Sequence, residues 1–159
     1  MGRVAWHTSL GAGGICSGEV EDGSTNQMWK VFQWPSAGQM RYLKMFILSE
    51  GRRYQDLTPR TDLISPNRDG KANGATGWAY GSCMPEKDLF LAYFENNCPP
   101  ARLSGLLPDT KYRAQWFDPR TGQWSPAGNG VLKANQWGWI QLPDFPAADD
   151  WGLKLTLSN

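Results

Sequence analysis

The sequence of 159 residues predicts a mainly β protein, an antiparallel β-sandwich preceded by a small α/β segment. Two observations carry this prediction. Before residue 50 apolar residues recur at helical spacing, and from Gly77 onward they alternate with the period of two that is typical of strands. Turn residues then divide the second half into several short strands, which is the pattern of a sandwich or barrel. We expect a boundary near residue 60, between a segment 1–60 and a β-sandwich 61–159.

The first segment reads as helical pieces joined by loops. Residues 3–10 predict a short helix ending at Gly11, and the small residues 11–18 predict a short buried strand. Residues 19–27 are acidic and polar, which predicts a loop.

An amphipathic helix is expected at 36–50. Ser36 and Gln39 form a capping box directly after Pro35. Gly51 is expected to end this helix, and residues 51–77, rich in Arg, Asp, Pro, Gly and Asn, predict a linker. The apolar positions of this helix are Met40, Leu43, Phe46 and Ile47.

The second half predicts a sequence of strands and turns. Residues 89–94 are apolar on both faces, so we expect a central strand covered on both sides. A turn at 85–88 would place Met84 opposite Leu89. Residues 112–116 alternate, 118–122 form a turn with Pro near its start and Gly at its end, and residues 151–157 alternate and would close the core.

Composition excludes several classes of protein. The chain has 16 Lys and Arg against 15 Asp and Glu, a net charge of +1 without a basic run, so we expect no nucleic acid and no anionic membrane as partner. No segment approaches the roughly 20 apolar residues that span a bilayer. The length is too short for a (β/α)8 barrel of about 200–250 residues. Residues 1–7 show no signal-peptide pattern, which leaves the compartment open.

The cysteines predict neither a bridge nor a metal site. Of the three, Cys83 and Cys98 flank the expected hairpin, but its register separates them by about 25 Å along the strand, and a disulfide needs Cα atoms within about 7 Å. The third is Cys16, so at least one thiol is unpaired within the chain. No pair has CxxC spacing and His7 stands alone, so we expect no zinc, and no cofactor.

Residues 112–124 resemble a known family. Their sequence, YRAQWFDPRTGQW, is similar to the Y-x-A-x-W-[FY]-D-P-R-T-G signature of the C-terminal β-sandwich of apiosidase-like glycoside hydrolases, a domain also labelled collagen-binding. Residues 142–153 resemble the closing P…D-W-x-L strand of that family. The first 60 residues are similar, more weakly, to the seventh helix, eighth strand and eighth helix of its barrel, but Ile15 and Ser17 stand where the family usually has His and Tyr.

The resemblance implies the tail of a glycoside hydrolase, secreted or periplasmic, without its catalytic pair. In the family the two catalytic carboxylates precede the segment that matches residues 3–10. We therefore expect a non-catalytic module that binds a polysaccharide or oligosaccharide. Two alternatives stay open: a fragment or assembled form of a plant-polysaccharide hydrolase, and a structural or protein-binding module.

The sequence itself offers weak catalytic candidates. Glu19 and Glu21 have strand-like spacing after the expected strand at 11–18, where barrel active sites lie, and hydrolysis of a glycoside needs two carboxyl groups about 5–10 Å apart. A solvated acidic loop explains them as well, so we predict no catalytic residue. Asp118 is expected to cap its own turn, and Asp149 and Asp150 to fix a loop.

The nine Trp divide into expected core and expected surface. Trp116 and Trp151 fall on apolar faces and predict core. At 137–142, Gly138, Ile140 and Leu142 form the inward face. The outward residues, together with Trp124 nearby and a second pair further away, are candidates to stack on sugar rings: Trp137, Trp139, Gln141, Trp124, Trp78 and Tyr80.

Two points about packing stay open. Trp137 and Trp139 could instead pack against the N-terminal segment or a missing barrel. The apolar residues of that segment need a partner, either the sandwich itself or another copy of the chain in a homo-oligomer. They are Val4, Trp6, Ile15, Met40, Leu43, Phe46 and Ile47.

Overall fold

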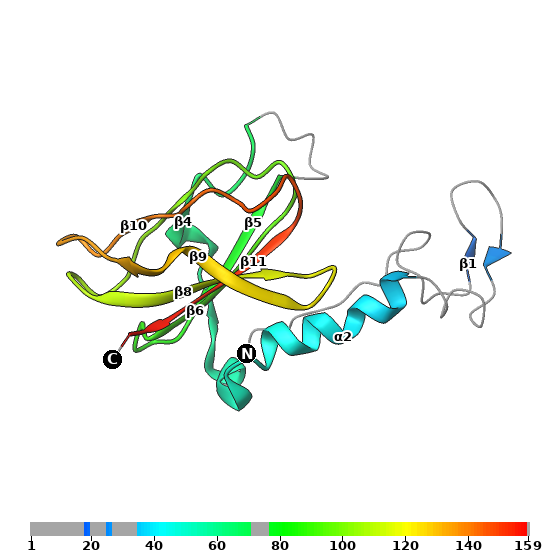
Figure 1. Ribbon diagram of the computed structural model, residues 1–159, viewed down its shortest axis with the longest axis horizontal. Coiled ribbons are helices and arrows are strands. Elements are labelled where there is room, and N and C mark those ends of the chain that lie inside the picture. The colour runs from blue at the N-terminus through cyan, green and yellow to red at the C-terminus, as the bar shows by residue number, and fades with distance from the viewer. Residues whose placement is uncertain (1–17, 20–24, 27–34, 71–76, 159) are drawn as a thin grey trace.

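The computed structural model describes residues 18–19, 25–26, 35–70 and 77–158, which form a β-sandwich with one α-helix against it (Figure 1). The expected mainly β, antiparallel architecture is confirmed. Among these residues, no helix has the length and hydropathy that crossing a membrane requires. The predicted helix at 3–10 and most of the predicted strand at 11–18 lie outside the described residues.

Two sheets make the sandwich. The large sheet has the strand order β3-β5-β6-β11-β8-β9 and the small sheet the order β10-β7-β4. The strands of the large sheet are β3 (Thr58–Pro59), β5 (Ala79–Cys83), β6 (Leu89–Phe94), β8 (Lys111–Asp118), β9 (Gln123–Lys133) and β11 (Trp151–Leu157). Those of the small sheet are β4 (Ile64–Ser65), β7 (Arg102–Leu103) and β10 (Ile140–Gln141).

The remaining elements belong to the first half of the chain. They are the paired strands β1 (Gly18–Glu19) and β2 (Thr25–Asn26), the helix α2 (Pro35–Ile47), and the 3-10 helices η1 (Gly51–Asp56) and η2 (Thr61–Leu63). Residues 51–70 are therefore not a linker, because β3 pairs with β5 and β4 pairs with β7. Strands of two residues are too short to show a hydrophobic period, so they cannot be predicted from the sequence pattern. The division into segments 1–60 and 61–159 stays a prediction.

The main core lies between the two sheets. Trp116 and Trp151 are buried there, as predicted, with exposed fractions of 1% and 7%. Tyr112 is fully buried as well; its hydroxyl donates to the carbonyl oxygen of Lys87 at 2.9 Å and accepts from the backbone N–H of Leu107 at 3.0 Å. A buried tyrosine whose hydroxyl is satisfied adds apolar area without an unpaired polar group.

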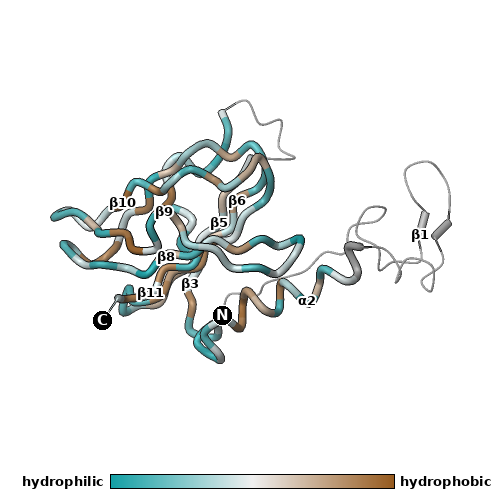
Figure 2. The backbone as a smooth tube through the Cα atoms, viewed as in Figure 1, coloured by the Kyte–Doolittle hydropathy of each residue, from teal (hydrophilic) through white to brown (hydrophobic). Residues whose placement is uncertain are grey.

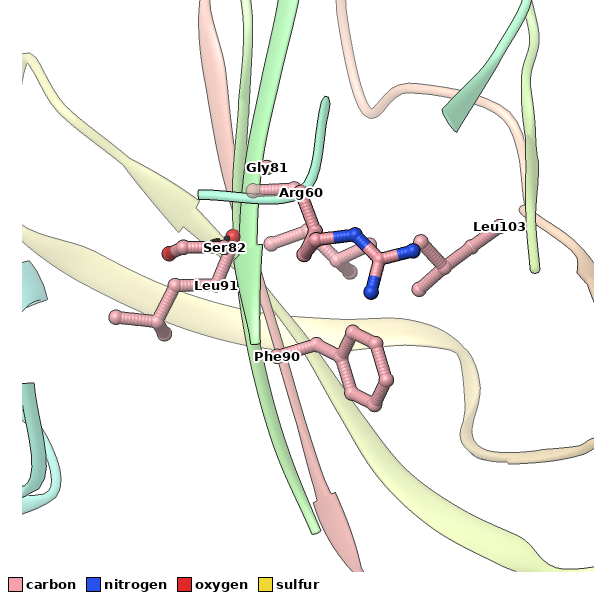
Figure 3. Close-up of a pocket in the computed structure, with 8 residues that line it drawn as sticks. Arg60, Gly81, Ser82, Phe90, Leu91 and Leu103 are labelled. Atoms are coloured by element: carbon pink, nitrogen blue, oxygen red, sulfur yellow. Dashed lines mark hydrogen bonds between the residues drawn. The ribbon is translucent and has the colours of Figure 1, made fainter. Parts of the chain in front are cut away.

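Strand β6 is covered on both faces, as its apolar run predicted. Phe90 points toward the small sheet and Leu91 to the opposite side (Figure 3). The cavity of about 10 Å³ beside Phe90 holds at most one water molecule, so it is no ligand site. Met84 N–H donates to the Leu89 carbonyl at 3.0 Å, which confirms the predicted hairpin register.

The two described cysteines are free and buried. Cys83 lies in β5 and Cys98 follows β6, and no bridge joins them. Burial raises the pKa of Cys98 to about 11 and also raises that of Cys83. Cys16 lies outside the described residues.

A second, smaller core forms where α2 packs on the outer face of the large sheet. Phe46 stacks on Phe117 and Trp124, at ring distances of 5.3 and 5.8 Å. Gly152 makes room for it, since a Cβ there would come within 2.8 Å of the Phe46 ring. The helix thus folds back on the sandwich, one of the two arrangements expected; pairing with another copy stays a prediction.

The helix differs in detail from its prediction. It begins at Pro35 and ends at Ile47, with Gly51 in the left-handed conformation (φ +63°) after a final turn. Its packed side chains are Tyr42, Phe46 and Ile47. Apolar residues recur along α2 (Figure 2), but Met40 and Leu43 are only half-buried. The contact face is rotated toward Tyr42, because the turn at Gly122 meets the Tyr42 ring.

Candidate functional site

The outward residues of the segment 137–142 lie at one end of the small sheet. Trp137 is 72% exposed, Trp139 is half-buried and Gln141 is exposed. Ile140 and Leu142 point into the main core, as predicted. The expected strand is shorter than predicted, since β10 covers only Ile140–Gln141 and Trp137 lies in the turn before it.

That turn is fixed by hydrogen bonds to one residue, Asn135. Its side-chain Oδ1 accepts from the backbone N–H of Trp137 at 3.0 Å and of Trp139 at 3.1 Å. Its backbone N–H donates to the Trp139 carbonyl at 3.1 Å, and its carbonyl accepts from Gly138 at 2.9 Å. This is the three-residue hairpin in which a turn is followed by a left-handed residue, and it places Trp137 at the tip.

Gly138 is the residue that such a hairpin requires. Its φ is +71°, and a Cβ at this position would lie 2.4 Å from the carbonyl oxygen of Leu106. Its own carbonyl accepts from the Leu106 N–H at 3.0 Å. The base beneath Trp137 is therefore held by backbone contacts on two sides.

Polar side chains continue the surface across the small sheet. Ser65, Arg102 and Gln141 lie directly opposite one another in register, so they share the outer face. The Arg102 guanidinium lies 5.2 Å from the centre of the Trp139 ring, a cation–π distance. The Gln141 amide donates to the Ala101 carbonyl at 3.2 Å. We call Trp137, Trp139, Gln141 and Arg102 the Trp137 surface.

Sequence reasoning missed Arg102 and Ser65. The alternation Ala101, Arg102, Leu103 was a usable signal, since Ala101 and Leu103 are buried and Arg102 is exposed. Ser65 gave no signal, because its position opposite Arg102 follows from a pairing between distant parts of the chain.

Trp124 does not join this surface, and its predicted place nearby was wrong. It packs under α2, with its ring 4.7 Å from Phe117. Trp124 stands near the start of β9 and Trp137 after its end. Trp124 lies opposite Phe117, and the end of β9 that leads to Trp137 lies opposite Lys111. At roughly 3.3 Å per residue, these six residues of β8 place the two ends of β9 about 20 Å apart along the sheet.

Trp78 and Tyr80 form a separate group around Glu95. The Trp78 backbone N–H donates to Glu95 Oε2 at 3.2 Å and the Tyr80 hydroxyl to Oε1 at 3.3 Å. Arg68 lies over the Trp78 ring at 5.5 Å. Burial, and then the charge of Glu95, raise the pKa of Tyr80, which is still 49% exposed. Tyr80 lies opposite Tyr93 in the large sheet, whereas the Trp137 surface belongs to the small sheet.

The acidic residues expected to hold turns do so. Asp118 Oδ1 accepts from the backbone N–H of Arg120 at 2.8 Å and from its Nε at 2.9 Å. Arg120 also pairs with Asp149. Asp150 accepts from the Tyr93 hydroxyl at 2.6 Å and the Asn96 N–H at 2.7 Å, and burial together with Asp150 raises the pKa of Tyr93. These side chains join the turn after β8 to the loop before β11.

The structure does not bring the weak catalytic candidates together into a site among the described residues. Glu19 lies in β1, paired with Thr25 of β2. Glu21 and His7 lie outside the described residues. Within the described ranges no three residues among His, Cys, Asp and Glu come close enough together to hold a metal ion.

Comparison with known proteins identifies the fold. A solved structure named "Glycoside hydrolase" matches with a TM-score of 0.61 at 17% sequence identity, over 86% of this chain and 28% of that one. No family model matches, and no curated protein matches. The chain thus spans less than a third of the matched protein, and its fold is one that a glycoside hydrolase contains.

Proposed function

We propose that this chain is a non-catalytic glycan-binding module of glycoside-hydrolase origin, and that the Trp137 surface holds the sugar. The observation that carries the proposal is the 72% exposure of Trp137 on a turn fixed by Asn135 and Gly138. The turn at 118–122 and the closing strand at 151–157 favour an apiosidase-like parent within that broader class.

The chemistry of the surface suits a neutral sugar chain. Sugar rings have apolar C–H faces that stack on indole rings, and hydroxyl groups that need a few oriented polar partners. Trp137 and Trp139 supply rings, and Gln141 and Arg102 supply donors on the same face. Because the turn is already held in place, little conformational entropy is lost when a ligand binds.

The same surface does not favour hydrolysis. Its four residues are two indoles, an amide and a guanidinium, whereas glycoside hydrolysis uses two carboxyl groups about 5–10 Å apart. Of the acids that follow Gln141 in the sequence, Asp144 is exposed, and Asp149 and Asp150 are engaged by Arg120, Tyr93 and Asn96. Binding without turnover is therefore the role that these side chains support.

The test is retention on insoluble polysaccharides by Trp137→Ala and by the double variant Trp137→Ala/Trp139→Ala. We expect retention to fall in the single variant and vanish in the double. The Tm of Trp137→Ala should stay nearly unchanged, because the side chain is mostly in water. Tyr54→Ala is the matched control, an exposed aromatic on η1. Undiminished retention by the double variant, or an equal loss in the control, would refute the proposal.

Assays on the same purified protein distinguish two alternative functions from glycan binding. Because the fold resembles part of a glycoside hydrolase, a hydrolase fragment is the first alternative. Release of reducing sugar by the unmodified chain, abolished by Glu19→Gln or Glu21→Gln, would favour this alternative. An exposed tryptophan also suits a protein surface. Failure to bind any polysaccharide, combined with capture of collagen by the unmodified chain but not by Trp137→Ala, would select a protein-binding module.

A further inference from the structure

We propose a second ligand site, for an acidic sugar, in the groove between α2 and the outer face of the large sheet. The groove is open to solvent and has a volume of about 570 Å³, within the range of about 300–1,000 Å³ typical of small-molecule sites. Its lining residues are Arg41, Lys44, Met45, Leu48, Ser49, Trp124 and Lys154.

The groove follows from how the helix packs. Tyr42 and Phe46 anchor α2 on the sheet. Arg41, Lys44, Met45 and Leu48 follow at i, i+3, i+4 and i+7, so they form one helix face beside that anchor. This face carries two cations and two apolar side chains, and Met45 and Leu48 are 47% and 38% exposed.

The floor of the groove contains a buried charge. Lys154, in the central strand β11, is only 8% exposed. Its Nζ lies 2.8 Å from Glu50 Oε1 and 4.5 Å from the centre of the Trp124 ring. Glu50 balances Lys154, whereas Arg41 and Lys44 form no ion pair with any carboxylate of the described residues. The groove therefore has a net positive charge, although the chain as a whole is nearly neutral.

Ser49 gives an independent indication of a ligand. Its Oγ is buried and lacks a hydrogen-bond partner among the described residues, and it lines the same groove. A buried hydroxyl without a partner is unfavourable, so such a group is normally satisfied by a neighbour, a water molecule or a ligand.

These features together select the ligand class. Met45 and Leu48 offer exposed apolar surface for the C–H face of a sugar. Ser49 offers a partner for a hydroxyl, and Arg41 and Lys44 a positive charge for a carboxylate. A uronic acid has all three groups on one ring. The groove is formed by the large sheet and the Trp137 surface by the small one, so the two sites are independent.

The experiment follows the indole N–H signals of the ¹⁵N-labelled chain by NMR during titration with glucuronate, glucose and acetate. Glucose differs from glucuronate only in having a CH₂OH group in place of the carboxylate. We expect glucuronate to move the Trp124 signal, with a response that weakens as NaCl is added. Glucose and acetate should move it much less. An equal response to acetate would mean adventitious anion binding, and an equal response to glucose would exclude carboxylate recognition; either would overturn the proposal.

Variants then locate the site. Arg41→Gln/Lys44→Gln should bind glucuronate about tenfold more weakly, because two partly exposed charge contacts are lost. Lys111→Gln, an exposed lysine in β8, is the matched control and should bind as the unmodified chain does. Unchanged affinity in the double variant would overturn the assignment. Trp137→Ala should retain the glucuronate response, which keeps this result separate from that of the Trp137 surface.

Discussion

On the outer face of the large sheet Trp124 lies beneath α2 and stacks on Phe46 and Phe117, whereas beside the small sheet Trp137 is 72% exposed. Trp124 follows a turn, Trp137 lies in one, and neither belongs to the main core. The difference is coverage, because a helix folds onto one face and the described residues place none on the other (Figure 1). The same side chain thus stabilises the fold on one face and is free to meet a ligand on the other.

Phe46→Ala would remove that coverage and should have the largest effect. Phe46 is 6% exposed and contacts both Phe117 and Gly152. Truncation of a buried phenylalanine costs about 3–5 kcal/mol of unfolding free energy, measurable by urea denaturation. Met45→Ala, at the preceding and exposed position, is the control and should change stability by less than about 0.5 kcal/mol. Similar losses in both would mean that α2 does not protect the large sheet.

Gly138→Ala tests the uncovered face. Both the positive φ and the approach of Leu106 oppose a Cβ, so we expect a loss of about 2–3 kcal/mol and reduced polysaccharide retention. Gly130→Ala separates the two causes: its φ is +86°, but the nearest atom, Pro126 Cβ, is 3.6 Å away. It should cost about 1 kcal/mol and leave retention intact. Full retention in Gly138→Ala would show that the turn does not orient Trp137.

Asp118→Asn should have the smallest effect, through loss of the ion pair with Arg120 within the turn after β8. Burial opposes ionisation of Asp118, but hydrogen bonds from Arg120 outweigh it and lower the pKa of the carboxyl. A lowered pKa stabilises the folded state above the unfolded value of about 3.9 and loses that contribution as pH falls through the folded value.

The variant should therefore be about 1 kcal/mol less stable at pH 7, with partial exposure of Arg120 taken into account. The gap should close as pH falls through the lowered pKa of the folded state, which thermal unfolding at decreasing pH would measure. Asp62→Asn is the control, because the Arg60–Asp62 pair is at the surface. A gap that persists in acid would show that the carboxylate is not what stabilises the turn.

Local pattern predicted three of the long strands well, but not the longest, β9 (Gln123–Lys133). Residues 89–94, 112–116 and 151–157 carry enough alternating or continuous apolar positions to define strands, and the hairpin turn fixed the pairing of Met84 with Leu89. Strands β3, β4, β7 and β10 have two residues each, so no period is visible in them. Their pairing is decided by contacts between distant segments.

The candidate site also has a part that local pattern predicted and a part that it did not. Alternation correctly separated Trp137 and Gln141 from Ile140 and Leu142. The position of Trp124 depends on the strand order and on where α2 packs, and neither can be predicted from a local sequence pattern. The groove beside α2 has the same origin, since Arg41 and Lys154 are far apart in the chain.

The position of β11 has a consequence for how the protein is made. The strand lies between β6 and β8, and nearly every residue of 151–157 is paired on both sides. On a ribosome the hairpin of β5 and β6 and that of β8 and β9 can form early, but they cannot join until residue 157 has left the exit tunnel. Assembly of the large sheet thus waits for β11, and until then the unpaired edges of two separate hairpins are exposed to chaperones and to one another.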